Sequence, residues 1–121
     1  LDTATFNSPT GYAATAIANG ANARAVIIQT NGQIVAAGYG IGDFTTQFAL
    51  ARYSTTGLLD SSFGSGGIVL TDIESLSCDA YINAGVQGLA LQSSGNIIAA
   101  GNTNFCAVLA CYFASGGTGY S

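Results

Sequence analysis

The stretch AVIIQTNGQIVAAG, from Ala25 to Gly38, decides the fold. Two short apolar runs flank a central Asn-Gly pair, and both of these residues readily adopt the positive φ that a type I′ turn requires. The arrangement predicts a β-hairpin with Asn31 and Gly32 at its turn. The flanking runs are apolar at consecutive positions and do not alternate with polar residues, which predicts a sheet that is covered on both faces.

The same hairpin pattern occurs a second time. GLALQSSGNIIAAG, from Gly88 to Gly101, aligns with the first stretch without a gap at an offset of 63 residues. Gly95 then takes the position of Gly32, with Ser94 before it, and predicts a second hairpin turn. Internal repeats of this kind are typical of chains built from several copies of one supersecondary unit.

Two further segments repeat around the hairpins. FALARY (48–53) aligns with AVLACY (107–112), and LDTATF, with which the sequence opens, aligns with LDSSF (59–63). The chain therefore divides into two units of about 60 residues, 1–58 and 59–121, whose length differences fall in loops, where insertions are tolerated. Each unit predicts four short antiparallel strands. The expected fold is all-β, with two four-stranded sheets arranged like the blades of a β-propeller.

A set of three segments resembles the delta-60 repeat family: IIQTNGQIVAAG, FALARYSTTGLLDSSFGSGGIVLTD and LALQSSGNIIAAG. The resemblance covers nearly all of both units. It implies a propeller-like fold of four-stranded blades, and it implies no particular activity. The sequence departs from the family pattern at charged positions, because neither hairpin turn has the expected Asp and Lys. In addition, Cys111 stands in the second unit where Arg52 stands in the first.

The repeat pattern continues from the end of the sequence to its beginning. After CYFASGGTGYS the next element of the pattern is LD-x-F, which is missing there and present as Leu1-Asp2. We therefore expect the end of one chain to complement the start of another, so that neighbouring subunits complete the blades. Such a head-to-tail contact closes into a ring of roughly 4 to 8 blades when the rotation permits, and otherwise grows into a fibre. Excision from a longer repeat protein would explain the same residues.

Charged residues are scarce, at 7% of the chain against roughly 25% in ordinary soluble domains. A net charge of −4 with only two cations argues against nucleic-acid binding, which needs clustered Lys and Arg. Every apolar run is interrupted before about 18 residues accumulate, so no membrane insertion is expected. A surface with few ions is poorly protected against self-association, which favours copies of the chain itself as partners, although a polar Ser, Thr, Asn and Gln surface would also keep it soluble. The composition also favours an extracellular or cell-surface location.

The sequence lacks the usual catalytic side chains. It contains no His and no Lys, which removes serine triads, metal–histidine sites and Schiff bases. We therefore expect no enzyme and no cofactor. Asp2 and Asp60 occupy the same repeat position, where a carboxylate caps the backbone N–H groups of a turn. Asp72, Glu74 and Asp79 lie near one another but lack the spacing of an EF-hand, so a solvated loop is favoured over a Ca²⁺ site.

The three cysteines leave one over if two of them pair. Cys106 and Cys111 are five residues apart on one expected strand, so their side chains point to opposite faces and cannot bridge each other. Cys78 can pair with either of them, which would pin the long loop of the second unit to its blade. Buried free thiols are the alternative.

Tyrosine and asparagine side chains offer the flat apolar faces and amide donors that sugars contact. The candidates for such a site are Tyr53, Tyr112 and Asn102. Because Tyr53 and Tyr112 occupy equivalent repeat positions, packing of blade against blade is favoured over sugar binding for these two. We therefore expect a non-catalytic extracellular module that forms a ring or surface fibre by head-to-tail association. The alternative is a multivalent, lectin-like propeller that binds carbohydrates between its blades.

Overall fold

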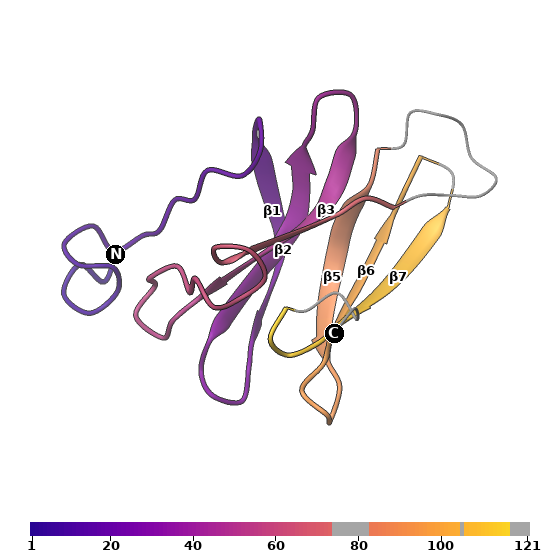
Figure 1. Ribbon diagram of the computed structural model, residues 1–121. Coiled ribbons are helices and arrows are strands. Elements are labelled where there is room, and N and C mark those ends of the chain that lie inside the picture. Colours follow the sequence, from indigo (N-terminus) through magenta and orange to yellow (C-terminus); the bar gives the residue numbers. More distant parts are fainter. Residues whose placement is uncertain (74–82, 105, 117–121) are drawn as a thin grey trace.

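The computed structural model describes residues 1–73, 83–104 and 106–116 (Figure 1). These residues form seven strands and no helix, so the all-β prediction is confirmed. In particular, they contain no helix long and apolar enough to cross a membrane. The strands are β1 (Ala21–Ile28), β2 (Ile34–Ile41), β3 (Thr46–Tyr53), β4 (Ile68–Thr71), β5 (Gly85–Leu91), β6 (Ile97–Asn102) and β7 (Ala107–Tyr112).

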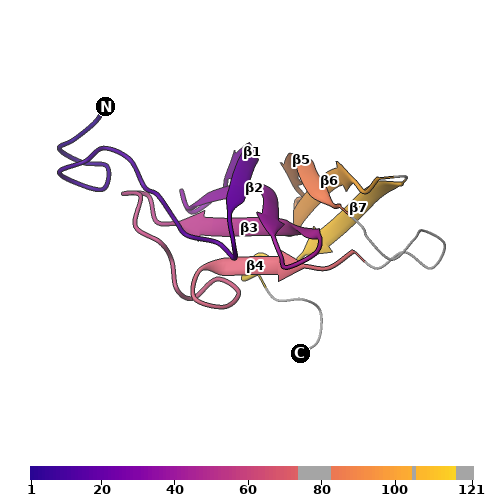
Figure 2. The same ribbon diagram turned by 90° about the horizontal axis from the view of Figure 1, so that it is seen from above.

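The strands form two antiparallel sheets. The first has the order β1-β2-β3-β4 and the second the order β5-β6-β7. The sheets stand side by side, with β1 and β5 in contact at the same edge of the molecule (Figure 2). Four strands were predicted for each unit, but the described part of the second sheet has three. In the first sheet the fourth strand, β4, follows the LDSSF segment (59–63), and the described residues after β7 contain no counterpart of this segment.

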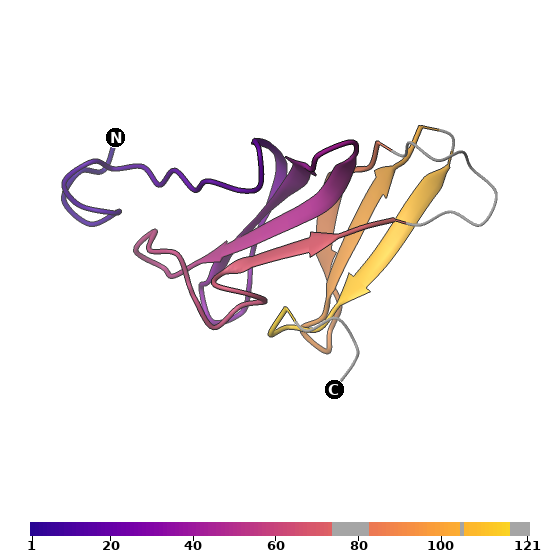
Figure 3. The ribbon, with the colours of Figure 1, turned by 45° about the horizontal axis from the view of Figure 1, so that its top comes forward.

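The sheets are out of phase with the sequence repeat by one strand. The predicted units end at residue 58 and begin at residue 59, yet β4 lies beyond this boundary and pairs with β3 of the first sheet (Figure 3). The units 1–58 and 59–121 therefore do not coincide with the two sheets. The register of β3 and β4 joins Leu50 to Val69 and Ala51 to Ile68.

Both hairpin turns differ from the predicted type I′ geometry. Gly32 has a φ of +86° and Gly95 a φ of +89°, whereas Asn31 and Ser94 do not adopt a positive φ. In each loop the Gly amide donates a hydrogen bond, of 2.8 or 2.9 Å, to the glutamine carbonyl three residues earlier. This is a three-residue loop with glycine in the left-handed position. The hairpins were predicted correctly, and the turn type was wrong because only the last loop residue needs a positive φ.

A β-bulge occurs at the same place in both sheets. The register of β1 with β2 shifts at Arg24, and the register of β5 with β6 shifts at Gln87. Each bulge brings a carbonyl group close to the partner strand. A Cβ atom would lie 1.8 Å from that oxygen at Gly38 and 2.1 Å from it at Gly101. The glycine that ends both apolar runs is therefore required by close backbone approach.

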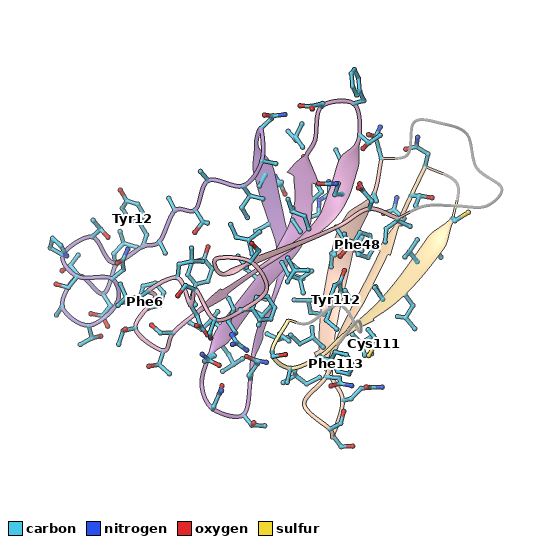
Figure 4. All side chains as sticks on the ribbon, viewed as in Figure 1. Phe6, Tyr12, Phe48, Cys111, Tyr112 and Phe113 are labelled. Carbon is cyan, nitrogen blue, oxygen red and sulfur yellow. The ribbon has the colours of Figure 1, made fainter. Side chains whose placement is uncertain are left out.

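The hydrophobic core lies between the two sheets. Figure 4 places Phe48 and Tyr112 in this layer. Its buried residues are Val35, Ala37, Phe48, Leu50, Phe63 and Val69 from the first sheet and its loops, and Ala84, Val86, Ile97, Ala99 and Tyr112 from the second.

Each sheet packs against the other with one face, where the sequence predicted cover on both. On the other face of the first sheet Ala49 and Ala51 are buried as well (4% and 3% exposed), so that face is partly covered. The other face of the first sheet exposes Val26 (62%) and Ile28 (57%). The other face of the second sheet exposes Leu109 (72%). Consecutive apolar residues in β1, β2 and β6 therefore supply one buried face and one open apolar face.

Candidate assembly faces and the cleft between the sheets

The two sheets meet through unlike faces. We call the face that the first sheet turns toward the second its front face, and the face that the second sheet turns toward the first its back face. The front face of the first sheet carries Ile27, Val35, Ala37, Phe48, Leu50 and Arg52. The back face of the second sheet carries Leu89, Leu91, Ile97, Ala99, Val108, Ala110 and Tyr112. Both are mainly apolar, so burial of apolar area drives the contact.

In the described part of the chain, each sheet also has an opposite face, against which no other sheet packs. On the first sheet this is the back face, with Val26, Ile28, Ile34, Ala36, Ala49, Ala51 and Tyr53. On the second sheet it is the front face, with Ala90, Ile98, Ala100, Leu109 and Cys111. The repeat offsets of 63 and 59 residues make these the counterparts of the residues in the contact. The chain thus carries one unpaired face of each kind.

The N-terminal segment 12–17 lies over part of the open back face. The segment is extended, and its residues alternate between exposed and half-buried as in a strand. It pairs with no strand among the described residues. Ala13, Thr15 and Ile17 line a hollow of about 220 Å³ between the segment and β1–β3.

The contacts of this segment repeat those of β4. The Thr15 hydroxyl lies 2.6 Å from the Tyr53 hydroxyl. The Tyr112 hydroxyl donates a hydrogen bond of 2.9 Å to the Thr71 hydroxyl. Thr15 and Thr71 align in YAATAI and IVLTDI, and Tyr53 and Tyr112 align in the repeat. Segment 12–17 therefore contacts the back face of the first sheet in the same way as β4 contacts the back face of the second sheet.

The loops that precede these two segments also make equivalent contacts. The backbone N–H of Asn7 donates a hydrogen bond of 2.7 Å to a carbonyl in the loop after β3. The backbone N–H of Gly64 donates a hydrogen bond of 3.4 Å to the carbonyl at the equivalent position after β7. Phe6 packs on the glycine of the first loop and Phe63 on the glycine of the second, where a Cβ atom would lie 2.6 or 2.7 Å from the ring. The whole N-terminal region thus reproduces residues 59–73.

A largely buried ion pair on the front face of the first sheet holds Arg52 against the second sheet. Arg52 Nε lies 2.9 Å from Asp60 Oδ2, and the two side chains are 9% and 15% exposed. Arg52 Nη1 donates a bond of 2.7 Å to the carbonyl of Ala114, in the loop after β7. The guanidinium group lies 4.7 Å from the centroid of the Phe63 ring. Arg52 therefore links β3, the loop before β4 and the second sheet.

Asp60 is held at both of its carboxylate oxygens. Oδ1 accepts hydrogen bonds from the Ser62 amide at 3.0 Å and the Ser62 hydroxyl at 2.6 Å. Gln33 Nε2 donates to Oδ2 at 2.6 Å. The bond from the Ser62 hydroxyl, together with the Arg52 charge, lowers the pKa of Asp60 below its usual value. Asp60 is therefore a charged structural anchor at neutral pH.

Asp2 makes a similar turn at the equivalent repeat position. Its Oδ1 accepts hydrogen bonds from the amides of Ala4 at 3.1 Å and Thr5 at 2.9 Å. The Thr5 hydroxyl donates to Oδ2. These bonds, led by that of the Thr5 hydroxyl, lower the pKa of Asp2. The two aspartates thus cap equivalent loops.

The described residues contain no group of three or more His, Cys, Asp and Glu side chains that could hold a metal ion. Asp72, which the sequence places near two other acidic residues, accepts a hydrogen bond from Gln47. Glu74 and Asp79 lie outside the described residues.

Cys111 takes the place of Arg52 on the open front face. It is an exposed free thiol, with its Sγ 3.8 Å from Gln92 Oε1. Cys106 is half-buried just before β7, and its amide donates to the Thr103 hydroxyl. The predicted partner Cys78 lies outside the described residues, so a disulfide from it to Cys106 stays a prediction, whereas the alternative pairing with Cys111 does not agree with the free Cys111 thiol.

Two of the three predicted ligand candidates lie on the back faces. Tyr112 is 3% exposed and its hydroxyl is bound to Thr71. Burial raises the pKa of Tyr112. Tyr53 faces Thr15 of the N-terminal segment. The Tyr112 ring packs between the two sheets and presents little surface to a ligand, whereas the Tyr53 ring is half-buried and lines the hollow beneath segment 12–17.

The third candidate, Asn102, lies in a polar cleft between the sheets. The cleft has a volume of about 440 Å³, and Arg24, Tyr39, Gln87 and Asn102 are among the residues that line it. The Arg24 guanidinium lies 5.3 Å from the centroid of the Tyr39 ring. Gln87 Nε2 donates to Asn102 Oδ1 at 3.1 Å. Arg24 and Gln87 are the bulged residues of the two hairpins, and the hydrophobic pattern of the sequence carries no signal of a bulge.

Comparison with known proteins agrees with this architecture. A family described as "Domain of unknown function (DUF5122) beta-propeller" matches residues 29–63. The matched region runs from the first hairpin loop through β3 to the Asp60 turn. No curated protein and no solved structure matches the chain. The match supports a propeller-type repeat family, and it does not single out the delta-60 repeat.

Proposed function

We propose that this chain, which folds into β-propeller-type sheets, is a non-catalytic building block that assembles head to tail outside the cell. One observation carries the proposal: the described part of the chain leaves one front face and one back face without a second sheet, and these repeat the two halves of its internal contact. A second copy can therefore dock the back face of its first sheet on the open front face of the second sheet, as the back face of the second sheet docks on the front face of the first within the chain.

Burial of apolar area supplies the driving force for this contact. The open front face carries Leu109 at 72% exposure, and the open back face carries Val26 and Ile28 at 62% and 57%. Full burial of one such side chain contributes about 1.5 to 3 kcal/mol. Because the two faces are unlike, each copy keeps one free face after every addition. The contact therefore produces either a closed ring or a fibre.

Composition supports the remaining parts of the proposal. The low charge content of 7% offers little electrostatic resistance to association. The absence of His and Lys favours a role without catalysis. The resemblance to the delta-60 repeat is in keeping with a repeat unit, and the polar, uncharged composition favours an extracellular or cell-surface setting.

The test is the size of the native particle, measured by light scattering after gel filtration and by negative-stain imaging of the same sample. The parent chain should form rings of two to four copies, which would hold about 4 to 8 blades, or longer filaments. Leu109→Asp should dissociate these particles, because it places a charge in the buried contact. Phe44→Asp is the matched control, since Phe44 is 83% exposed on the β2–β3 loop and belongs to neither face.

The outcomes separate the proposal from its alternatives. A monomeric parent chain at all accessible concentrations would contradict the proposal. Equal dissociation by Leu109→Asp and Phe44→Asp would show that added charge alone disrupts association and that the front face has no special part in it.

Carbohydrate binding is the second candidate function. The cleft favours it because an aromatic ring, a guanidinium group and amide side chains meet there (Tyr39, Arg24, Gln87 and Asn102). Sugars bind to such combinations of flat apolar faces and hydrogen-bonding groups. Screening on a glycan array should then give binding that Tyr39→Ala abolishes, while Tyr12→Ala, at an exposed tyrosine outside the cleft, leaves it unchanged. An array without any bound glycan would count against this function.

A further inference from the structure

The edge of the second sheet at β7 differs from the equivalent edge of the first sheet. In the first sheet, β3 pairs with β4 in the register Phe48–Thr71, Ala49–Leu70, Leu50–Val69 and Ala51–Ile68. β7 is the repeat counterpart of β3, and it forms the end of its sheet in the described part of the chain. Its outer backbone N–H and C=O groups are therefore positioned for a further strand.

The N-terminal segment 12–17 has the converse property. It is extended and alternates in exposure like a strand, and it has no strand partner among the described residues. Its contacts with the first sheet, through Phe6, Asn7 and Thr15, are those that the β4 region makes with the second sheet. The segment is thus held where the fourth strand of a preceding sheet would lie.

Within one chain the two features are far apart. Figures 1 and 3 show the N-terminal segment and β7 on opposite sides of the molecule, with the remaining strands between them. Figure 4 likewise places Phe6 and Tyr12 on the opposite side from Cys111. The segment therefore cannot reach β7 of its own chain without leaving the sheet on which it packs.

We propose that segment 12–17 of a second copy adds to β7 as the fourth strand of the second sheet. This inference rests on the proposed head-to-tail assembly and names the contact that forms there. Docking the open back face of one copy on the open front face of another brings the segment beside β7 with no change in its own position. Main-chain hydrogen bonds then extend the sheet across the two chains.

The repeat specifies the register of this added strand. Transfer of the β3–β4 pairing places Thr15 opposite Ala107, Ala14 opposite Val108, Ala13 opposite Leu109 and Tyr12 opposite Ala110. The next pair along is Gly11 and Cys111. Its counterparts in the first sheet are Gly67 and Arg52, where the Arg52 amide donates to the Gly67 carbonyl at 3.0 Å.

This hydrogen bond identifies which opposite pairs lie closest. Hydrogen-bonded and non-hydrogen-bonded pairs alternate along an antiparallel ladder, and the latter bring their Cα atoms to about 4.5 Å. Counting from the bonded pair of Arg52 and Gly67, Ala49 and Leu70 form a non-hydrogen-bonded pair. Their counterparts Val108 and Ala14 should therefore accept an engineered disulfide, for which a Cα separation of about 4.4 to 6.8 Å is needed.

The same transfer predicts a missing ion pair in the contact. Asp2 of the second copy would take the place of Asp60, but Cys111 stands where Arg52 would pair with it. The contact between copies therefore lacks the charged link that the contact within the chain has. Cys111→Arg should restore this link and strengthen the assembly.

The first experiment is site-specific cross-linking of the 121-residue chain, with its three native cysteines replaced by Ser. A tagged Ala14→Cys chain and an untagged Val108→Cys chain are mixed and oxidised mildly. A disulfide-linked heterodimer is expected. Ala13→Cys replaces Ala14→Cys in the control, because its side chain points to the opposite face of the segment and should give at least tenfold less heterodimer.

The second experiment does not depend on cross-linking. Cys111→Arg should lower the dissociation constant for association about tenfold, and Asp2→Asn should cancel this gain while having a smaller effect in the parent chain. Both are measured by analytical ultracentrifugation.

Selective heterodimer formation and the gain with Cys111→Arg would support the strand addition. Particles of the parent size without selective cross-linking, or a gain that survives Asp2→Asn, would overturn it and leave head-to-tail assembly standing. A parent chain that remains monomeric would overturn both proposals.

Discussion

Replacement of Arg52 by Cys would give the first sheet the residue that the second sheet carries at the equivalent position. The change removes the 2.9 Å contact with Asp60 and the 2.7 Å hydrogen bond to the carbonyl of Ala114. It also removes the guanidinium group from the Phe63 ring. All three contacts join the first sheet to its loop or to the second sheet, so the variant tests what holds the sheets together.

The expected cost follows from the burial of the pair. Loss of one partner from a buried ion pair costs about 3 to 5 kcal/mol. Asp60 is 15% exposed and keeps its hydrogen bonds from Gln33 and Ser62, so its charge remains partly stabilised by these donors and by solvent. These bonds reduce the expected loss of unfolding free energy to about 2 to 3 kcal/mol. A domain with about 5 to 15 kcal/mol of stability would still fold.

Urea unfolding followed by circular dichroism is the assay. With a slope near 2 kcal/mol/M, the midpoint should fall by roughly 1 to 1.5 M. Arg24→Cys is the matched control, because Arg24 is exposed and lies over the Tyr39 ring, with no ion pair to any of the described residues. Its loss should therefore cost less than about 1 kcal/mol. If the two variants unfold at the same urea concentration, the reasoning about the Arg52 contacts is refuted.

Three further predictions concern pH and backbone approach. The lowered pKa of Asp60 means that its charged form stabilises the fold, so stability should decline as the pH falls below about 4, and Asp60→Asn should flatten this decline in urea titrations at acid pH. The raised pKa of Tyr112 means that the fold favours its neutral form, so stability should decline as the pH rises above about 10, and melting curves of Tyr112→Phe should lack that contribution. Gly101→Ala should lower the unfolding free energy by more than about 2 kcal/mol, because the new Cβ would lie 2.1 Å from a carbonyl oxygen. Gly88→Ala is the control: a Cβ there would have no atom within 4 Å, so the unfolding free energy should change by less than about 1 kcal/mol. Equal midpoints of urea unfolding for the two variants would contradict this prediction.

Hairpin positions and the repeat could be predicted from the sequence because both depend on local patterns. Gly32 and Gly95 mark the loops, and their positive φ follows from the shape of any tight hairpin. The turn type could not be predicted, because Asn31 can adopt either sign of φ, and the hydrogen bonds between the two flanking strands determine which sign it takes. The bulges at Arg24 and Gln87 were missed for a similar reason, since an extra residue in a strand does not alter an apolar run.

The candidate site was only partly predictable. Asn102 lies in the cleft, but Arg24 and Tyr39 reach it from β1 and β2, more than 60 residues earlier in the sequence, and no local pattern joins them. Tyr53 and Tyr112 could be paired by the repeat. Their hydroxyl partners, Thr15 and Thr71, become visible only when the segments that carry them are placed on the sheets.

The sequence by itself determined that the chain is all-β, that it repeats, and where its hairpins turn, because each of these depends on residue order over short distances. The tertiary structure decided which face of each sheet is buried, which strand completes the first sheet, and which faces remain open. These depend on contacts such as that of Arg52 with Ala114, which are 62 positions apart, and on the packing of one whole sheet against another. Consecutive apolar residues show that both faces of a sheet are suited to burial. Only the arrangement in space shows which of the two faces packs against the other sheet of the same chain.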